Sequence, residues 1–127
     1  MKAILLILLA VLLSLTGCGQ GSEADSYRQI SQEEAKEMMD SQEVLILDVR
    51  EQEEYDSGHI PGAVLLPVGT IDEDTAAAVI PEKDTAVLVY CRSGNRSKKA
   101  SAALAELGYT GIHEFGGIST WPYETEE

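Results

Sequence analysis

The stretch 86–107, AVLVYCRSGNRSKKASAALAEL, combines a nearly continuous apolar run, a polar loop and a helical pattern. Residues 86–90 (AVLVY) predict a central strand covered on both faces, because short runs without polar alternation are typical of buried parallel strands. Residues 97–107 carry apolar side chains at helical spacing and stop at Gly108, which predicts a helix with a glycine just beyond its end. Strand, loop and helix in this order indicate one unit of an α/β domain.

Further short apolar runs extend this pattern along the chain. Residues 44–47 (VLIL) predict a second central strand, because the run is again nearly continuous. Shorter strands are predicted at residues 27–30, 63–66 and 112–115, the last two of which are bracketed by glycine or proline. Such strands alternate with polar-faced stretches, so the sequence predicts an α/β domain of parallel strands joined by crossover helices.

Polar residues mark the expected helix starts. Ser31, with Glu34 three residues later, has the spacing of a capping box and predicts a helix that reaches about Asp40. The acidic groups at 51–54 and 72–74 are interpreted as solvated helix starts, where carboxylates interact favourably with the positive end of the helix dipole. No chemistry is assigned to them.

Length and composition limit the classes of function. The chain has 127 residues, with 9 Lys and Arg against 22 Asp and Glu, a formal net charge of −13. One domain fits this length, and general nucleic-acid binding is disfavoured because an acidic field repels phosphate. The two cysteines, Cys18 and Cys91, are too few for a disulfide scaffold or a four-thiolate zinc site. The residues suggest no metal and no organic cofactor.

The N-terminus has the pattern of a targeting signal. Lys2 precedes an apolar run over 3–13, which is shorter than the roughly 20 residues that span a bilayer. The run ends in Leu-Thr-Gly-Cys at 15–18, which resembles a bacterial lipobox. We therefore expect a signal peptide at 1–17 and a lipid on Cys18, with 19–26 (GQGSEADS) as a flexible tether to an extracytoplasmic membrane surface. The alternative is a secretory peptide or short anchor helix in which Cys18 is incidental.

The loop from Cys91 to Ser97 (CRSGNRS) has the composition of a reactive site. A cysteine between a strand and a helix start can be surrounded by backbone N–H groups and by the positive end of the helix dipole, which stabilises thiolate. Four of the nine positive side chains lie within nine residues here, at Arg92, Arg96, Lys98 and Lys99. This concentration of positive charge favours an anionic substrate and a nucleophilic Cys91. The alternative is a buried structural cysteine followed by a solvated basic turn.

Several motifs together resemble a known family. The loop CRSGNRS resembles the active-site loop of single-domain rhodaneses, which are sulfurtransferases. The segments LDVRE at 47–51, EY at 54–55, GHIPGA at 58–63, and GG at 116–117 with Trp121 resemble other motifs of the family, in the same order. The resemblance covers 27–123 and leaves 124–127 as an acidic tail. It implies a five-stranded parallel sheet with helices on both faces.

The resemblance also implies that Cys91 takes a sulfur atom from a donor and holds it as a persulfide. The Cys91 thiolate would attack the outer sulfur of an anionic donor such as thiosulfate, and a thiol, cyanide or protein acceptor would then take the sulfur. Backbone amides from Arg92 through Ser93, Gly94 and Asn95 to Arg96 would hold the transferred sulfur. Arg92 would attract the donor, and Gly94 would permit the tight turn.

Other residues are expected to support the loop. Arg96 is predicted to form a bidentate ion pair with Asp48 at the end of the neighbouring strand. Arg50 either joins the same network or is solvated. Ser97 is expected to cap the following helix rather than to react. His59 is expected to shape a turn rather than to act in catalysis.

Two alternative functions remain at this stage. Dual-specificity phosphatases and some arsenate reductases resemble rhodaneses, but in their loops five residues separate the cysteine from the arginine. In this chain only four residues separate Cys91 from Arg96. A shorter loop makes a smaller site, which suits one sulfur atom better than a tetrahedral oxyanion. The other alternative is a membrane-tethered persulfide carrier or binding module that acts on a partner protein. A monomer is expected in each case.

Overall fold

The computed structural model describes residues 26–127, in which one sheet forms the centre of an α/β domain. The five strands are all parallel, in the order β1-β5-β4-β2-β3. Their bounds are β1 Arg28–Gln29, β2 Leu45–Asp48, β3 Val64–Leu65, β4 Val87–Cys91 and β5 Ile112–Gly117. The predicted α/β class and five-stranded parallel sheet are confirmed. The predicted signal peptide, Cys18 and nearly all of the tether lie outside the described residues.

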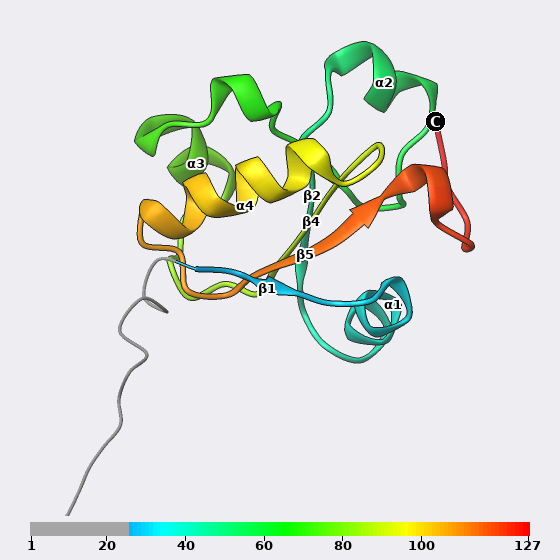
Figure 1. The fold of residues 1–127 in the computed structure, drawn as a ribbon, viewed down its shortest axis with the longest axis horizontal. Coiled ribbons are helices and arrows are strands. Elements are labelled where there is room, and N and C mark those ends of the chain that lie inside the picture. Colours follow the sequence, from blue (N-terminus) through cyan, green and yellow to red (C-terminus); the bar gives the residue numbers. More distant parts are fainter. Residues whose placement is uncertain (1–25) are drawn as a thin grey trace, which may run out of the picture.

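Four α-helices of the described chain pack around this sheet. Their bounds are α1 Gln32–Ser41, α2 Gln52–Ser57, α3 Glu73–Val79 and α4 Asn95–Glu106. Helices α3 and α4 lie on one side of the sheet and α1 lies on the other (Figure 1). Short 3-10 turns follow β3 at Val68–Thr70 and β5 at Ile118–Thr120. Among these described helices, none has the length and apolar character needed to cross a bilayer.

Strand β4 is buried on both faces, as its continuous apolar run predicts. Val87 and Val89 point to the core beneath α3 and α4, whereas Leu88 and Tyr90 point to the core that contains Ala35 of α1. All of the strand's side chains are buried, because a hydrophobic core lies against each face of the sheet and β2 and β5 cover its two edges. The strand continues one residue beyond the predicted range and therefore includes the cysteine itself.

The capping residues account for where three helices begin. The Ser31 hydroxyl accepts a hydrogen bond from the Glu34 amide at 3.0 Å and starts α1, as predicted. Glu51 and Asp72 are the N-caps of α2 and α3, so both acidic groups do mark helix starts. Helix α4 differs, because it begins at Asn95 and its N-cap is a glycine.

Candidate active site

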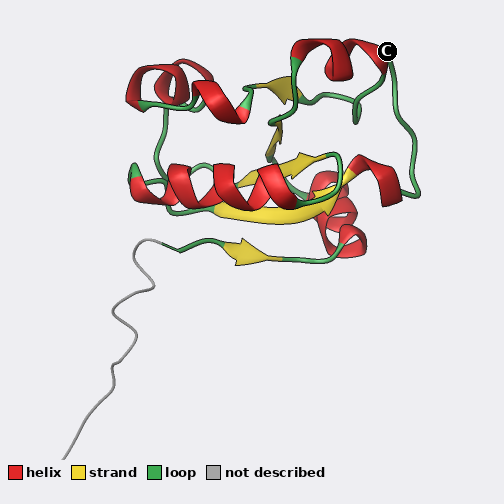
Figure 2. Cartoon of the chain, turned by 45° about the horizontal axis from the view of Figure 1, so that its top comes forward, coloured by secondary structure: helices red, strands yellow, loops and turns green. Residues whose placement is uncertain are grey.

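Cys91 is the last residue of β4 and lies at the carboxyl edge of the sheet. The chain turns immediately after it and enters α4, which runs back along the sheet (Figure 2). Gly94 makes this turn at φ 110°, a left-handed conformation that other residues adopt only with strain. The turn brings the start of α4 back over the cysteine, so that only 1% of Cys91 is exposed.

Hydrogen-bond donors surround the Cys91 sulfur. The Gly94 amide donates to Sγ at 3.0 Å. Burial raises the pKa of the Cys91 thiol, but hydrogen bonds from the Ser97 hydroxyl and from the amides of Gly94, Ser97 and Ser93 outweigh burial. The net effect is a pKa below the ordinary value for cysteine. This arrangement favours thiolate, which is the nucleophilic form.

Arg96 joins the loop to α2 through Glu54. Its Nη1 and Nη2 atoms donate to the two carboxylate oxygens at 2.8 and 3.0 Å, a bidentate ion pair between half-buried side chains. The hydrogen bond from Arg96 lowers the pKa of Glu54 to about 2. The pair ties the first turn of α4, which follows the cysteine loop, to α2.

The predicted ion pair between Arg96 and Asp48 is wrong. Asp48 is enclosed by Arg50, two residues after it, and by Tyr90 of β4, whereas Arg96 pairs with Glu54 of α2. The sequence gives no reason to assign chemistry to Glu54, because an acidic residue at a helix start has a sufficient local explanation. The EY motif at 54–55 is the only sequence signal that singles this residue out.

Asp48 forms a separate buried network with Arg50 and Tyr90. Arg50 Nη2 and the Tyr90 hydroxyl donate to Asp48 Oδ2, each at 2.7 Å. Arg50 also donates to the Gly58 carbonyl at 2.7 Å, and the Ile60 amide donates to the Tyr90 hydroxyl at 3.0 Å. Arg50 is therefore paired with Asp48 rather than solvated, but the network that it joins does not include Arg96. It ties the ends of β2 and β4 to the turn that follows α2.

The end of β5 supports the loop from behind. Cys91 is paired in register with Gly117, and a side chain at Gly117 would collide with the Arg92 carbonyl. The Ser119 amide donates to that same carbonyl at 3.1 Å. The second glycine of the GG motif is therefore required for β5 to approach the loop backbone closely.

Ser97 has a different role from the predicted one. It lies within the first turn of α4 and is fully buried, so it is not the helix cap. Its Oγ is 3.0 Å from the Gly94 carbonyl and 2.5 Å from Oε2 of Glu114 on β5. Glu114 itself was missed, because a single glutamate in a strand of mixed pattern has no distinguishing sequence signal.

The remaining site residues are placed as follows. Arg92, Ser93 and Asn95 are exposed on the loop, where their amides and side chains can meet a ligand from solvent. His59 is buried and stacks on the Tyr55 ring at a centroid distance of 3.8 Å, with Nδ1 2.9 Å from the Tyr55 carbonyl oxygen. These contacts belong to the turn after α2. Within the described chain, no three His, Cys, Asp or Glu side chains are grouped so as to hold a metal ion.

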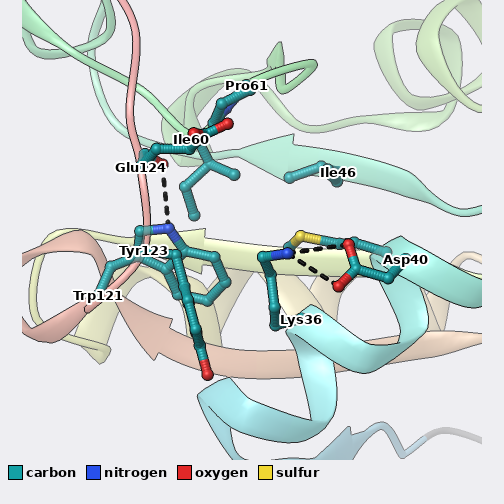
Figure 3. A pocket seen from close by; sticks show the side chains of 9 residues that line it. Lys36, Asp40, Ile46, Ile60, Pro61, Trp121, Tyr123 and Glu124 are labelled. Atoms are coloured by element: carbon teal, nitrogen blue, oxygen red, sulfur yellow. Dashed lines mark hydrogen bonds and ion pairs between the residues drawn. The ribbon is translucent and has the colours of Figure 1, made fainter.

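A separate pocket of about 220 Å³ lies near the C-terminus (Figure 3). Trp121 and Tyr123 line it on one side, and the ion pair of Lys36 with Asp40 closes another. No residue of the cysteine loop lines this pocket. The chemistry of the loop is therefore separate from this cavity.

The comparison with protein families agrees with this geometry. The model of the rhodanese-like domain matches residues 31–123, which include four of the five described strands, β2 to β5, and the cysteine loop. The chain belongs to the rhodanese family. This rhodanese domain accounts for nearly all of the described residues.

Named relatives of the rhodanese domain include thiosulfate sulfurtransferases. It is 40% identical over 72 residues to thiosulfate sulfurtransferase PspE of Escherichia coli (strain K12), covering 57% of this chain and 68% of that protein. It is 35% identical over 96 residues to thiosulfate sulfurtransferase GlpE of Coxiella burnetii (strain RSA 331 / Henzerling II), covering 75% of this chain and 87% of that protein. Some relatives are longer, and the matched region spans 55% of YrkF from Bacillus subtilis (strain 168).

Solved structures share the fold. A rhodanese with anions from E. coli superposes with a TM-score of 0.62 at 30% sequence identity, covering 67% of this chain and 99% of that one.

Proposed function

We propose that this protein is a sulfurtransferase that moves a sulfane sulfur from an anionic donor such as thiosulfate to a thiophilic acceptor. Cys91 would carry the sulfur between the two half-reactions. The observation that carries the proposal is the set of donors around Cys91 Sγ, with the Gly94 amide at 3.0 Å and a thiol pKa below its ordinary value. The names of PspE and GlpE support the same reaction class.

In the first half-reaction, the Cys91 thiolate attacks the outer sulfur of thiosulfate. A new S–S bond forms as the bond between the two thiosulfate sulfurs breaks, and sulfite leaves with the electron pair. The product is the Cys91 persulfide anion, so the total charge of the reactants is conserved. The loop amides face this sulfur, and hydrogen bonds to the developing negative charge stabilise the transition state.

In the second half-reaction, an acceptor attacks the outer sulfur of the persulfide. Cyanide would leave as thiocyanate, and a thiolate would leave as a persulfide, with the Cys91 thiolate regenerated in either case. Because only 1% of Cys91 is exposed, an acceptor must approach the sulfur past the exposed loop residues Arg92, Ser93 and Asn95. A small acceptor, or a protein that presents its thiol on an extended segment, meets this requirement.

The charge distribution supports an anionic donor. The whole chain carries −13, so an anion is repelled by most of its surface. Arg92 is exposed on the loop next to the cysteine, and Lys98 and Lys99 are exposed in the first turns of α4. A local positive site in an acidic protein directs a small dianion to the loop.

Mass spectrometry of the intact protein tests the proposal. The purified full-length protein is incubated with thiosulfate and then with cyanide, beside a Cys91→Ser control. We expect the native protein to gain the mass of one sulfur atom and to lose it to cyanide as thiocyanate, and the control to gain nothing. The absence of this gain in the native protein would contradict the proposal. Loading without turnover of small acceptors would instead favour a carrier that needs a protein partner.

We also propose that the protein is anchored outside the cytoplasm by a lipid on Cys18. The proposal is supported by the apolar run at 3–13 and the Leu-Thr-Gly-Cys segment at 15–18. In bacteria that produce the protein, we expect the mature chain to begin at an acylated Cys18 and to sediment with membranes. A Cys18→Ala variant should lose the acyl mass and the membrane association. An uncleaved or unacylated native chain would contradict this proposal.

A further inference from the structure

The residues after β5 run from the cysteine loop to the neighbourhood of α2. They begin with the 3-10 turn at Ile118–Thr120, and the C-terminal end lies beside α2 (Figure 1 and Figure 2). We call residues 118–126 the C-terminal strap. The family match ends at residue 123, so the last part of the strap lies beyond it. The strap nevertheless contacts the domain at both of its ends.

At its first end the strap contacts the peptide group between Arg92 and Ser93. The Ser119 amide donates to the Arg92 carbonyl at 3.1 Å. Gly117, directly before the strap, lies so close to this peptide that a Cβ atom there would collide with the Arg92 carbonyl and the Ser93 nitrogen. Because a peptide group is planar, a contact that fixes its carbonyl also fixes the direction of its N–H.

This peptide leads directly to the amide that holds the Cys91 sulfur. The Gly94 amide, which is the next along the chain, donates to Sγ at 3.0 Å. Cys91 itself is paired in register with Gly117 of β5. The strap therefore contacts the loop one peptide before the donor to the sulfur, so the position of that donor depends on the peptide that the strap holds.

At its other end the strap is fastened to the turn after α2. Glu126 and His59 form an antiparallel bridge, in which the amide of each residue donates to the carbonyl of the other at 2.8 Å. The Glu126 carboxylate also accepts from the Gly62 amide at 3.4 Å and lies 3.6 Å from His59 Nε2. Hydrogen bonds to Arg50 and Tyr90 hold this turn against the buried network, so the turn is a fixed support for the strap.

Most of the strap between its two ends is exposed. Trp121 is buried and packs on Phe115, with the ring centroids 5.4 Å apart, and Gln32 of α1 donates to the Thr120 hydroxyl at 3.0 Å. All of the residues from 122 to 127 are exposed. Because an exposed terminal segment frays unless it is tied down, the bridge at Glu126 is the contact that keeps the far end of the strap in place.

We propose that Glu126 is a positioning residue, which fastens the C-terminal strap and so holds the start of the cysteine loop at the Cys91 sulfur. Amide donors stabilise the negative charge that develops on sulfur during transfer, so their position affects the rate of the S–S exchange. The inference rests on the proposed function for its effect on sulfur transfer, whereas the fastening of the strap is measured without any reaction.

Amide hydrogen exchange, followed by NMR on the full-length protein, tests the fastening. Glu126→Pro removes the N–H that donates to His59 and the carboxylate beside it. We expect the Ser119 amide to exchange about tenfold faster, the equivalent of about one backbone hydrogen bond. The Val89 amide should keep its native rate, because the residue is fully buried in β4. Glu127→Pro, at an exposed position next to the bridge, is the matched control and should leave both rates unchanged.

Thiosulfate loading tests the consequence for the reaction. In Glu126→Pro we expect the maximal rate of loading, measured by quenched mass spectrometry, to fall about fivefold, because a small displacement of a positioned group slows a reaction. The thiosulfate concentration at half-maximal rate should change less than about twofold, since Arg92, Lys98 and Lys99 keep their charges and still attract the donor. Glu127→Pro should match the native protein in both quantities.

Three results would overturn the inference. One is a native exchange rate at Ser119 in Glu126→Pro, which would mean that the bridge does not fasten the strap. Another is an equal acceleration at Ser119 and Val89, which would make the bridge a contributor to global stability alone. The last is an unchanged maximal loading rate in a variant whose Ser119 amide exchanges faster. A native protein that takes up no sulfur contradicts the proposed function instead, and the exchange rates still decide whether Glu126 fastens the strap.

Discussion

Two arginine–carboxylate pairs in this domain have similar bond lengths and different surroundings. Arg50 and Asp48 meet at 2.7 Å with side chains 6% and 0% exposed, whereas Arg96 and Glu54 meet at 2.8 Å with side chains 33% and 30% exposed. The first pair joins residues two apart and is extended by Tyr90. The second joins residues 42 apart, from the cysteine loop to α2. The comparison shows that burial, not bond geometry, decides whether such a pair serves the fold or the site.

The largest expected effect comes from the buried pair. Asp48→Asn leaves the Arg50 charge buried without its counter-ion, and removal of one partner of a buried pair costs about 3 kcal/mol or more. We expect the free energy of unfolding, measured with urea, to fall by that amount, with little change in sulfur loading per folded molecule. Asp84→Asn, at an exposed position, is the matched control. A loss below about 1 kcal/mol would show that burial adds nothing to this pair.

A substitution at Tyr90 tests the hydrogen bonds of the buried network apart from the ion pair between Asp48 and Arg50. Tyr90→Phe keeps the ring in the core but leaves the buried Ile60 amide without its acceptor and Asp48 without one donor. An unsatisfied buried amide costs about 2 kcal/mol, and we expect this loss in the same urea experiment. A stability equal to that of the native protein would mean that water or another group replaces the hydroxyl.

The exposed pair should affect the reaction more than the fold. Glu54→Gln removes the charge that holds the Arg96 guanidinium in its bidentate contact. A half-exposed ion pair contributes only about 1 kcal/mol to the free energy of unfolding after solvent screening. Sulfur loading from thiosulfate should slow by about tenfold, because the first turn of α4 no longer holds the loop in position. Stopped-flow or quenched mass spectrometry measures this rate. Unchanged loading together with a large loss of stability would reverse the roles of the two pairs.

The smallest effect is the pH dependence of the exposed pair. The pKa of Glu54 is about 2 in the folded chain against an ordinary value of 4.5, so the unfolded chain binds more protons between these values. The contribution of the pair is therefore complete above pH 4.5 and is lost as the pH falls through about 2. The stability difference of about 1 kcal/mol between native protein and Glu54→Gln should disappear over that window. A difference that persists at pH 2 would contradict the assignment.

Much of the fold was predictable, because the sequence patterns that indicate its strands and helix starts are local. The runs VLIL and AVLVY indicated the two central strands, since a strand covered on both faces needs apolar residues without alternation. Ser31 indicated the start of α1, because a cap bonds to an amide only three residues away. Gly116 and Gly117 indicated the end of the last predicted strand, but not that the second glycine lies against the backbone of the cysteine loop.

The partners of the site residues were not predictable in the same way. Arg96 forms its ion pair with Glu54 rather than with Asp48, because Tyr90 and Arg50 already enclose Asp48. Ser97 turns inward to Glu114 because α4 begins two residues before the predicted start, which places the serine over β5. Both outcomes depend on packing between elements that are far apart in the chain.

The sequence alone determined the α/β class, the central strands and the cysteine loop, because hydrophobic period, turn residues and a local motif act over a few neighbouring positions. Only the tertiary structure decided which carboxylate braces the loop, which one lies buried with Arg50, and that Glu114 stands behind Ser97. These pairings depend on burial and on the contact between β5, α2 and α4. A chain has many carboxylates at suitable spacing, and folding selects the ones whose distance and desolvation match each donor.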